Sequence, residues 1–451
     1  MPKRKNNLNF NMKKILLLSS FLLSTPPLVT AAPMDFLQAF EQAQKDDPKI
    51  LAAEYQYLAT REALPQARAA LLPNVALDVF AAKHNDETTD QATAITTTDR
   101  YDSEGFILSL TQSLYNHAYW QKLLQADLTV AIGEANVNAA RQDLIVRVAQ
   151  AYYNLLAAQD NLKFATAEKT AIGKQLEQNQ QRLNVGLIAI TDVKESQAQY
   201  DISVAQWITA ENALANNRES LRTLIGVAAD ELAPLLDDMV LATPQPESID
   251  EWVKAALQGN LALKAAEISF EVAQKQVNIQ RAEHYPSVSL TARRNDVITD
   301  GVNSGDFERY DDSIMVNLNV PIYSGGLTHA KTREASALRE QARVLRDLSL
   351  RETEQLCRTS YLGVTASIAR VTAFKQALIS TQAAYEAIRA GYEVGTRTAI
   401  DELVGLREQY RAERDYAQSR YDYIINYLKL KQSAGMLSRD DVVLVNQWLV
   451  H

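Results

Sequence analysis

Several segments of the chain alternate strictly between apolar and polar side chains. Val75, Leu77 and Val79 illustrate the pattern, with polar or small residues between them. A period of two places the apolar side chains on one face of a β-strand, and an apolar outer face is typical of strands in membrane barrels. The alternation predicts four strands, at about 74–84, 104–115, 286–296 and 312–323.

Polar stretches separate the two strands of each predicted pair. Residues 84–102 and 297–312 are rich in Asp, Thr, Gly and Asn. Such composition is typical of loops, so we expect both stretches to be loops that face an aqueous exterior.

Two stretches of 68 residues, 118–185 and 327–394, contain no proline and are rich in Ala, Gln, Glu, Lys and Leu. An interior proline would cost about 3 kcal/mol and kink a helix. At about 1.5 Å per residue each stretch can form a helical rod of roughly 100 Å. The pattern therefore predicts two rods longer than any single globular core.

Each rod is followed by a glycine, Gly186 or Gly395, which suits the left-handed position just past a helix end. Asp192, and Thr398 with an acidic residue three positions later, are predicted to cap the helices that return. The predicted structures are helical hairpins at 118–226 and 326–435, with tips at 186–192 and 395–401.

The second half of the chain repeats the first at an offset near 209. Tyr152 matches Tyr361, and Gly226 matches Gly435. This period is too long for a stacked solenoid and indicates a duplicated protomer of mostly α structure, with a strand pair and a long hairpin in each copy. The predicted divisions are a first repeat at 32–226, a connection at 227–260, a second repeat at 261–435 and an end segment at 436–451; we expect Trp252 and Trp448 to be buried where the connection and end segment pack.

Four strands are too few to enclose a lumen, for which about eight or more are needed. An open sheet edge is not tolerated in lipid. Several copies must therefore pool their strands around a rotational axis. The residues alone leave the number of copies open.

The N-terminus has the features of a secretory signal peptide. Five cations and no acidic residue precede or flank a short apolar run from Ile15 to Leu23, and small residues follow at 29–31. Cleavage after Ala31 changes the net charge from −9 to −14, because five positive charges leave. So acidic a chain is a poor binder of nucleic acid.

Enzyme motifs and ligand clusters are absent from the sequence. The five histidines, at 84, 117, 284, 329 and 451, are scattered and form no metal-binding spacing. The single cysteine, Cys357, cannot form an intramolecular disulfide and is expected to be buried in a helix. We therefore expect no catalytic residues, no cofactor and no metal.

The order of elements and several local motifs resemble the TolC family of outer-membrane export channels. The resemblance covers the whole mature chain, and the hairpin tips are its most specific part. The motifs that carry it are Asp46-Asp47-Pro48, Leu72-Pro73-Asn74-Val75, Gln112-Ser113-Leu114-Tyr115, Ala151-Tyr152-Tyr153-Asn154, Val185-Gly186-Leu187-Ile188 with Thr191-Asp192, and Tyr392-Glu393-Val394-Gly395-Thr396-Arg397.

The resemblance implies a homotrimer in the outer membrane of a Gram-negative bacterium, with a 12-stranded β-barrel that continues into a periplasmic α-helical barrel. Such channels are exit ducts for tripartite efflux pumps or for type I protein secretion. The implied partners are a periplasmic adaptor, the membrane-fusion protein, and an inner-membrane pump of the RND, ABC or MFS type, in addition to outer-membrane lipid.

The resemblance also places a periplasmic gate at the tips. Its implied gate residues are Thr191, Asp192, Tyr392 and Arg397, and Asp401 would form an acidic constriction. Residues implied to contact the adaptor are Val185, Gly186, Leu187, Val394, Gly395 and Thr396.

The chain departs from the family pattern at Val404, where a second acidic residue can follow Asp401. The constriction is therefore expected to carry less charge or to have an apolar collar. Two alternatives stay open: Asp192 and Asp401 act only as helix caps, or Tyr392 only packs between helices. For the whole protein the alternative is a periplasmic coiled-coil scaffold without a pore.

Overall fold

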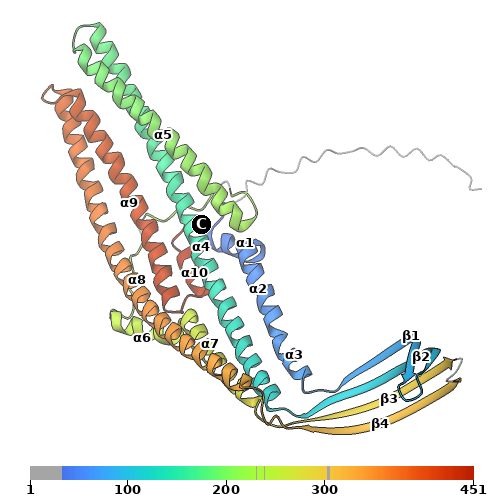
Figure 1. Ribbon diagram of the computed structural model, residues 1–451. Coiled ribbons are helices and arrows are strands. Elements are labelled where there is room, and N and C mark those ends of the chain that lie inside the picture. The colour runs from blue at the N-terminus through green and yellow to red at the C-terminus, as the bar shows by residue number, and fades with distance from the viewer. Residues whose placement is uncertain (1–32, 230, 238, 302–304, 451) are drawn as a thin grey trace, which may run out of the picture.

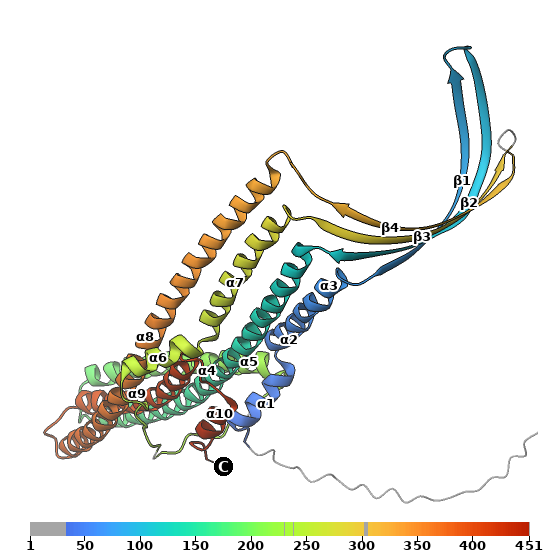
Figure 2. The same cartoon turned by 90° about the horizontal axis from the view of Figure 1, so that it is seen from below.

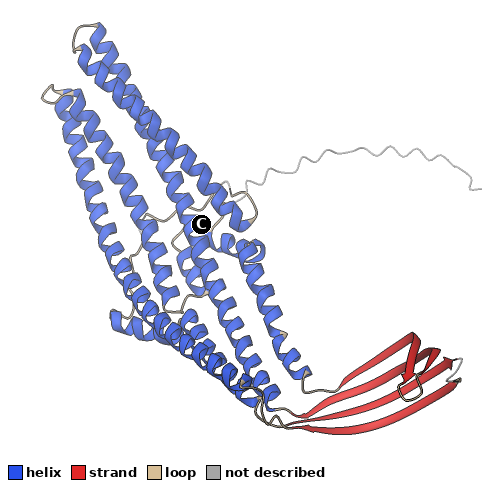
Figure 3. Ribbon diagram, in the orientation of Figure 1, coloured by secondary structure: helices blue, strands red, loops and turns tan. Residues whose placement is uncertain are grey.

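The computed structural model describes residues 33–229, 231–237, 239–301 and 305–450. The predicted signal peptide at 1–31 lies outside them. Helices form an elongated body, and a sheet extends from one end of it (Figures 1 and 3).

The sheet has four antiparallel strands in the order β1-β2-β3-β4. They are β1 (Asn74–Asp90), β2 (Ile95–Tyr115), β3 (Ser287–Gly301) and β4 (Phe307–Asn319). The β1–β2 hairpin is the longest and curves beyond β3 and β4 (Figure 2). β1 and β4 are the two edges of the sheet.

The expectation that 84–102 is a loop was wrong, because most of this stretch continues the strands. Thr88 pairs with Thr97, and the ladder continues to Asp90 and Ile95. Strand structure at 297–301 and 307–312 shortens the second predicted loop in the same way. Threonine favours strands whether or not its face is buried, so polar composition alone did not mark where the strands end.

Cross-strand pairing confirms the alternation of faces. Val79 pairs with Phe106, and Leu77 pairs with Leu108. On the other strand pair, Ala292 lies opposite Ile314. Leu110 pairs with Ala292, which links the two strand pairs. Directly paired residues share a face, so the alternating apolar residues predicted for all four strands lie on one side of the sheet.

Two long helical hairpins form most of the body. α4 (His117–Asn184, 68 residues) returns as α5 (Ile190–Ile225), and α8 (Leu327–Glu393, 67 residues) returns as α9 (Ala399–Ser433). The hairpins lie beside each other with both tips at the end opposite the sheet (Figure 1). Among the described helices, none has the run of apolar side chains that a bilayer crossing requires.

Shorter helices pack along these rods. Next to α4 lie α1 (Phe36–Asp46), α2 (Pro48–Arg61) and α3 (Ala63–Ala69). α7 (Leu261–Ala282) lies between α4 and α8, with α6 (Ile249–Gly259) against α8 and α10 (Arg439–Asn446) against α1.

The hydrophobic core lies where these short helices surround the rods. Tyr152 and Tyr153 are fully buried there, against Phe36. The Tyr152 hydroxyl donates to the carbonyl oxygens of Met34 at 3.0 Å and Ala233 at 3.1 Å, which ties the connecting segment to α4. Cys357 and Trp252 are buried, as predicted. Trp448 was also predicted to be buried but is only half-buried.

Candidate gate at the hairpin tips

Glycine ends both long helices, as predicted. Gly186 and Gly395 each have φ of +76°, a conformation that side chains with a Cβ rarely adopt. In the first tip the Leu187 amide donates back to the Arg182 carbonyl at 2.9 Å, which closes the helix end. Val185, Leu187 and Val394 are more than two-thirds exposed, so each tip presents apolar side chains to its surroundings.

Asp192 does not cap α5, contrary to the prediction. The cap position is Ala189, which makes no side-chain bond, and Asp192 lies in the first turn. There its carboxylate interacts favourably with the positive end of the helix dipole. The Thr191 hydroxyl donates to Asp192 Oδ1 at the long distance of 3.5 Å.

Asp401 does form the predicted cap with Thr398. Its Oδ2 accepts from the Thr398 amide at 3.0 Å, while the Asp401 amide donates to the Thr398 hydroxyl at 3.2 Å. The hydrogen bonds from the Thr398 amide and hydroxyl lower the pKa of Asp401, and the charge of Arg397 adds to the effect. Asp401 is therefore an anion at neutral pH. The cap and a position at a constriction are compatible, because Asp401 remains half-exposed.

Tyr392 connects the two hairpins. From α8 its hydroxyl accepts a hydrogen bond from Arg182 of α4 and donates to Asn179 Oδ1 at 3.4 Å. The Arg182 guanidinium also lies over the tyrosine ring, 4.9 Å from its centroid. This contact orients Tyr392 across the seam between the hairpins, so it does more than fill space between α8 and α9.

Arg397 packs back onto its own tip. Its amide donates to the Gly391 carbonyl at 3.2 Å. Its side chain lies so close to Gly391 that a Cβ there would come within 2.8 Å of Arg397 Cγ. Within one chain, the described residues contain no ion pair between Arg397 and Asp192. The charge of Arg397 acts instead on Asp401, whose pKa it helps to lower.

A cleft of 390 Å³ separates the hairpins beside Tyr392. Glu402 lines it and is buried, whereas its neighbour Asp401 is not. Burial raises the pKa of Glu402, although the charges of Arg389 and Arg182 oppose the rise. Val404, at the position of the missing acidic residue, is half-exposed.

Arg182, Asn179 and Glu402 were not among the residues predicted for the gate. A readable signal existed on α4, where Glu168, Gln175 and Arg182 are polar at intervals of seven. Residues seven apart lie on one face of a helix, and a polar stripe there indicates contacts with another hairpin.

The family model described as outer membrane efflux protein matches residues 39–227 and 252–436. It covers most of the chain in two segments. The chain belongs to the outer membrane efflux protein family. Outer membrane protein TolC of Vibrio cholerae serotype O1 is 38% identical over 91% of this chain and 93% of the relative. TolC of Escherichia coli K12 is 33% identical, covering 92% and 85%, and the alkaline protease secretion protein AprF of Pseudomonas aeruginosa is 29% identical, covering 92% and 87%.

Solved structures of outer membrane channels share the fold of this efflux family member. VceC of Vibrio cholerae aligns with a TM-score of 0.74 at 20% identity, covering 89% of this chain and 96% of that one. CmeC of Campylobacter jejuni aligns with a TM-score of 0.76 at 15% identity, covering 98% of both. At these identities the alignments speak for the fold alone.

Membership of the outer membrane efflux protein family establishes the class of function. The protein is an outer membrane channel for export in a Gram-negative bacterium, and its family is a transport family, not an enzyme family. None of the relatives named above supports a periplasmic scaffold without a pore.

Proposed function

We propose that three copies of the chain form one gated duct, in which 12 strands close a barrel and the hairpins form a periplasmic tunnel. The observation that carries this proposal is a sheet with one apolar face and two open edges. Backbone groups on the outer sides of β1 and β4 have no partner strand within the sheet. In lipid such edges must be paired, and a second copy offers the complementary edge.

The position of the apolar residues supports tilted strands. On the outward side, the continuous apolar run ends at Ala81 on β1, at Phe106 on β2, at Ala292 on β3 and at Ile314 on β4. The register moves this limit by about six residues over the three steps from β1 to β4, or roughly 6.6 Å along a strand for about 4.8 Å across. If the band lies parallel to the membrane, the strands tilt by about 54° from the membrane normal, steeper than the tilt of about 35–45° in membrane barrels.

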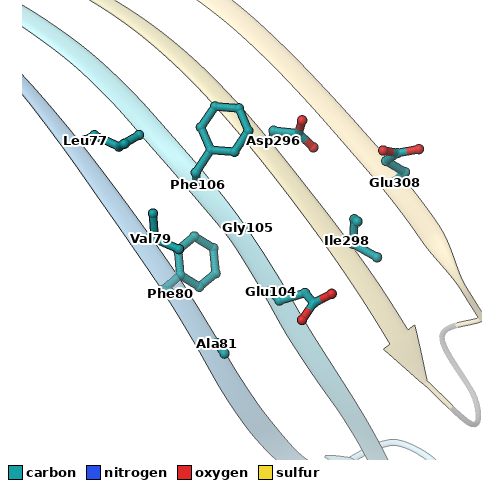
Figure 4. A pocket seen from close by; sticks show the side chains of 10 residues that line it. All are labelled: Leu77, Val79, Phe80, Ala81, Glu104, Gly105, Phe106, Asp296, Ile298 and Glu308. Carbon is teal, nitrogen blue, oxygen red and sulfur yellow. The ribbon is translucent and has the colours of Figure 1, made fainter. Parts of the chain in front are cut away.

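Charged side chains begin where this band ends. A hollow of 700 Å³ lies on the sheet at this level, and Figure 4 shows Leu77, Val79 and Phe106 near one another, with Glu104 and Asp296 on the same face. A change from apolar to charged side chains is expected where the lipid core meets the headgroups. The band therefore supports a membrane boundary at this level.

The helical edges support the same assembly. α8 lies beside β4 at one side of the protomer and exposes nine large aliphatic side chains, whereas α2 and α3 lie beside β1 at the other. The exposed residues of α8 are Leu327, Leu338, Val344, Leu345, Leu348, Leu350, Leu356, Leu362 and Ile379. An apolar patch of this size on a soluble part of a protein marks an interface. Packing α8 against α2 of the next copy would also cover Tyr55 and Leu58.

In this assembly the tips close the periplasmic entrance. Thr191, Asp192, Tyr392 and Arg397 are the proposed gate, in which Arg397 binds Asp192 of the neighbouring copy. Copies of Asp401 then face one another and favour cations in the pore. The exposed apolar tips at 185–187 and 394–396 are the proposed contact for a periplasmic adaptor, which would couple the duct to an inner-membrane RND, ABC or MFS pump.

The likeness to AprF extends the proposed cargo from small molecules to secreted proteins, because that relative is named for protease secretion. The test combines the mass of the detergent-solubilised complex with single-channel recording. A trimeric mass, a small resting conductance and a larger conductance in Arg397→Ser/Tyr392→Phe are expected. A water-soluble monomer without conductance would contradict the proposal.

A further inference from the structure

The seam between the two hairpins changes character along α4. In the core, α4 presents Val148, Tyr152 and Leu155, all fully buried. Further toward the tip the positions that face the second hairpin are Glu168, Gln175 and Arg182. The face of α4 toward α5 contains the fully buried Ile172 but also the buried Asn179, which donates to Ser196 Oγ of α5 at 2.8 Å. The interior of the first hairpin is therefore mixed near its tip, whereas the two hairpins meet there mainly through polar and charged groups.

Glu168 carries the buried ion pairs of this polar segment. Its side chain is 2% exposed, and Arg414 of α9 donates from Nη1 to Glu168 Oε2 at 3.3 Å. Arg407 lies seven residues before Arg414 on α9, on the same face of the helix. Its Nε is 3.9 Å from Glu168 Oε1. Arg407 also donates to Gln199 Oε1 of α5 at 2.8 Å. One carboxylate thus joins α4 to α9 through two arginines, and one of these reaches α5.

We propose that Glu168 is a positioning residue for the entrance: its bonds to Arg414 and Arg407 fix the level at which the second hairpin can separate from the first. This inference rests on the proposed gated duct. From Glu168 to the end of α4 the chain rises by about 24 Å, and over this length the hairpins are held by Arg182–Tyr392 and by the polar cleft around Glu402. Between Glu168 and the apolar core around Tyr152, one further polar link joins the hairpins: the Tyr421 hydroxyl of α9 donates to Asp160 Oδ2 of α4 at 2.6 Å.

The burial of the Glu168 carboxylate makes the contact sensitive to the loss of one partner. Removing one member of a buried ion pair leaves the other charge uncompensated, whereas replacing both members is often tolerated. Burial raises the pKa of Glu168, whereas the charges of Arg414 and Arg407 oppose the rise. Tyr410, also on α9, is the other titratable group beside this carboxylate.

The test is a double-mutant cycle on the full-length trimer in planar bilayers, with the fraction of time spent in the open state as the readout. Glu168→Gln and Arg414→Gln are each expected to raise that fraction roughly tenfold, the change that about 1.4 kcal/mol produces. The double variant is expected to open no further than Glu168→Gln alone, because both substitutions break the same bond between α4 and α9. Glu177→Gln, on an exposed position of α4, is the matched control and should behave as the wild type.

The cycle separates positioning from general damage. Single variants that match the wild type, or a double variant that opens as far as the two single effects combined, would overturn the role of Glu168. If Glu168→Gln does not assemble, Arg414→Gln breaks the same bond from the other helix and decides the question. Opening of Arg397→Ser/Tyr392→Phe with no effect at Glu168 would reject this inference and leave the gated duct intact, whereas a wild type without conductance would reject the duct itself.

Discussion

Replacing Arg182 with glutamine should open the periplasmic entrance. This side chain is the only link from α4 that both hydrogen-bonds Tyr392 and stacks on its ring, as far as the described residues extend. A hydrogen bond to a charged group contributes about 1.5–3 kcal/mol, and an exposed cation–π contact about 0.5–1 kcal/mol. Because Arg182 is only half-buried, about 2 kcal/mol is a reasonable total, or roughly a 30-fold shift toward separation in each copy.

The assay is single-channel conductance of purified Arg182→Gln at neutral pH. Tyr392→Phe keeps the ring and loses only the hydroxyl, so it should open the entrance less than Arg182→Gln. Arg389→Gln is the control: this residue lines the same cleft, but its pair with Glu393 at 3.5 Å is well exposed and such pairs contribute little. An unchanged conductance in Arg182→Gln, alongside an open Arg397→Ser, would refute the role of the hairpin-to-hairpin contact.

Three further outcomes are expected. Asp401→Ala should shift the reversal potential away from cation preference and cost about 1 kcal/mol through loss of the cap; an unchanged reversal potential would remove Asp401 from the pore. Gly391→Ala should displace Arg397 and raise the conductance, with little change in melting temperature. Burial of Asp47 favours its neutral form, but the bond and charge of Arg147 outweigh burial and lower its pKa. Stability from Asp47 is therefore present above pH about 4 and is lost as pH falls through the lowered pKa, so Asp47→Asn should reduce the melting temperature at pH 7 but not near pH 2.

The long helices and the alternating strands could be read from the sequence because each depends on local rules. Proline-free stretches and glycines at 186 and 395 fix the rods and their ends, and the capping box at Thr398 was recognisable from spacing alone. The outer ends of the strands could not be predicted from the sequence, because threonine-rich segments occur in both strands and loops. Asp192 was misplaced because α5 begins two residues earlier, at a cap without a side-chain bond.

The contacts of the proposed gate could not be predicted from local sequence patterns. Tyr392 and Arg397 came from a resemblance in motif, whereas Arg182 lies 210 positions away from its partner Tyr392. Contact between them depends on how two hairpins pack, which no short segment encodes. The polar stripe on α4 was visible, but which helix it faces was decided by the core around Tyr152.

The outer edges of β1 and β4 have no partner strand within the sheet. In the proposed assembly, each chain therefore depends on its neighbours to close the sheet. A substitution that prevents strand pairing at β1 disrupts every interface that a copy carrying it forms through β1. If the assembly is the proposed trimer, a cell that makes intact and defective subunits in equal amounts would form only about one complex in eight from intact copies alone. Lesions in these two strands should therefore be dominant over the wild-type allele, unlike lesions that merely unfold the chain.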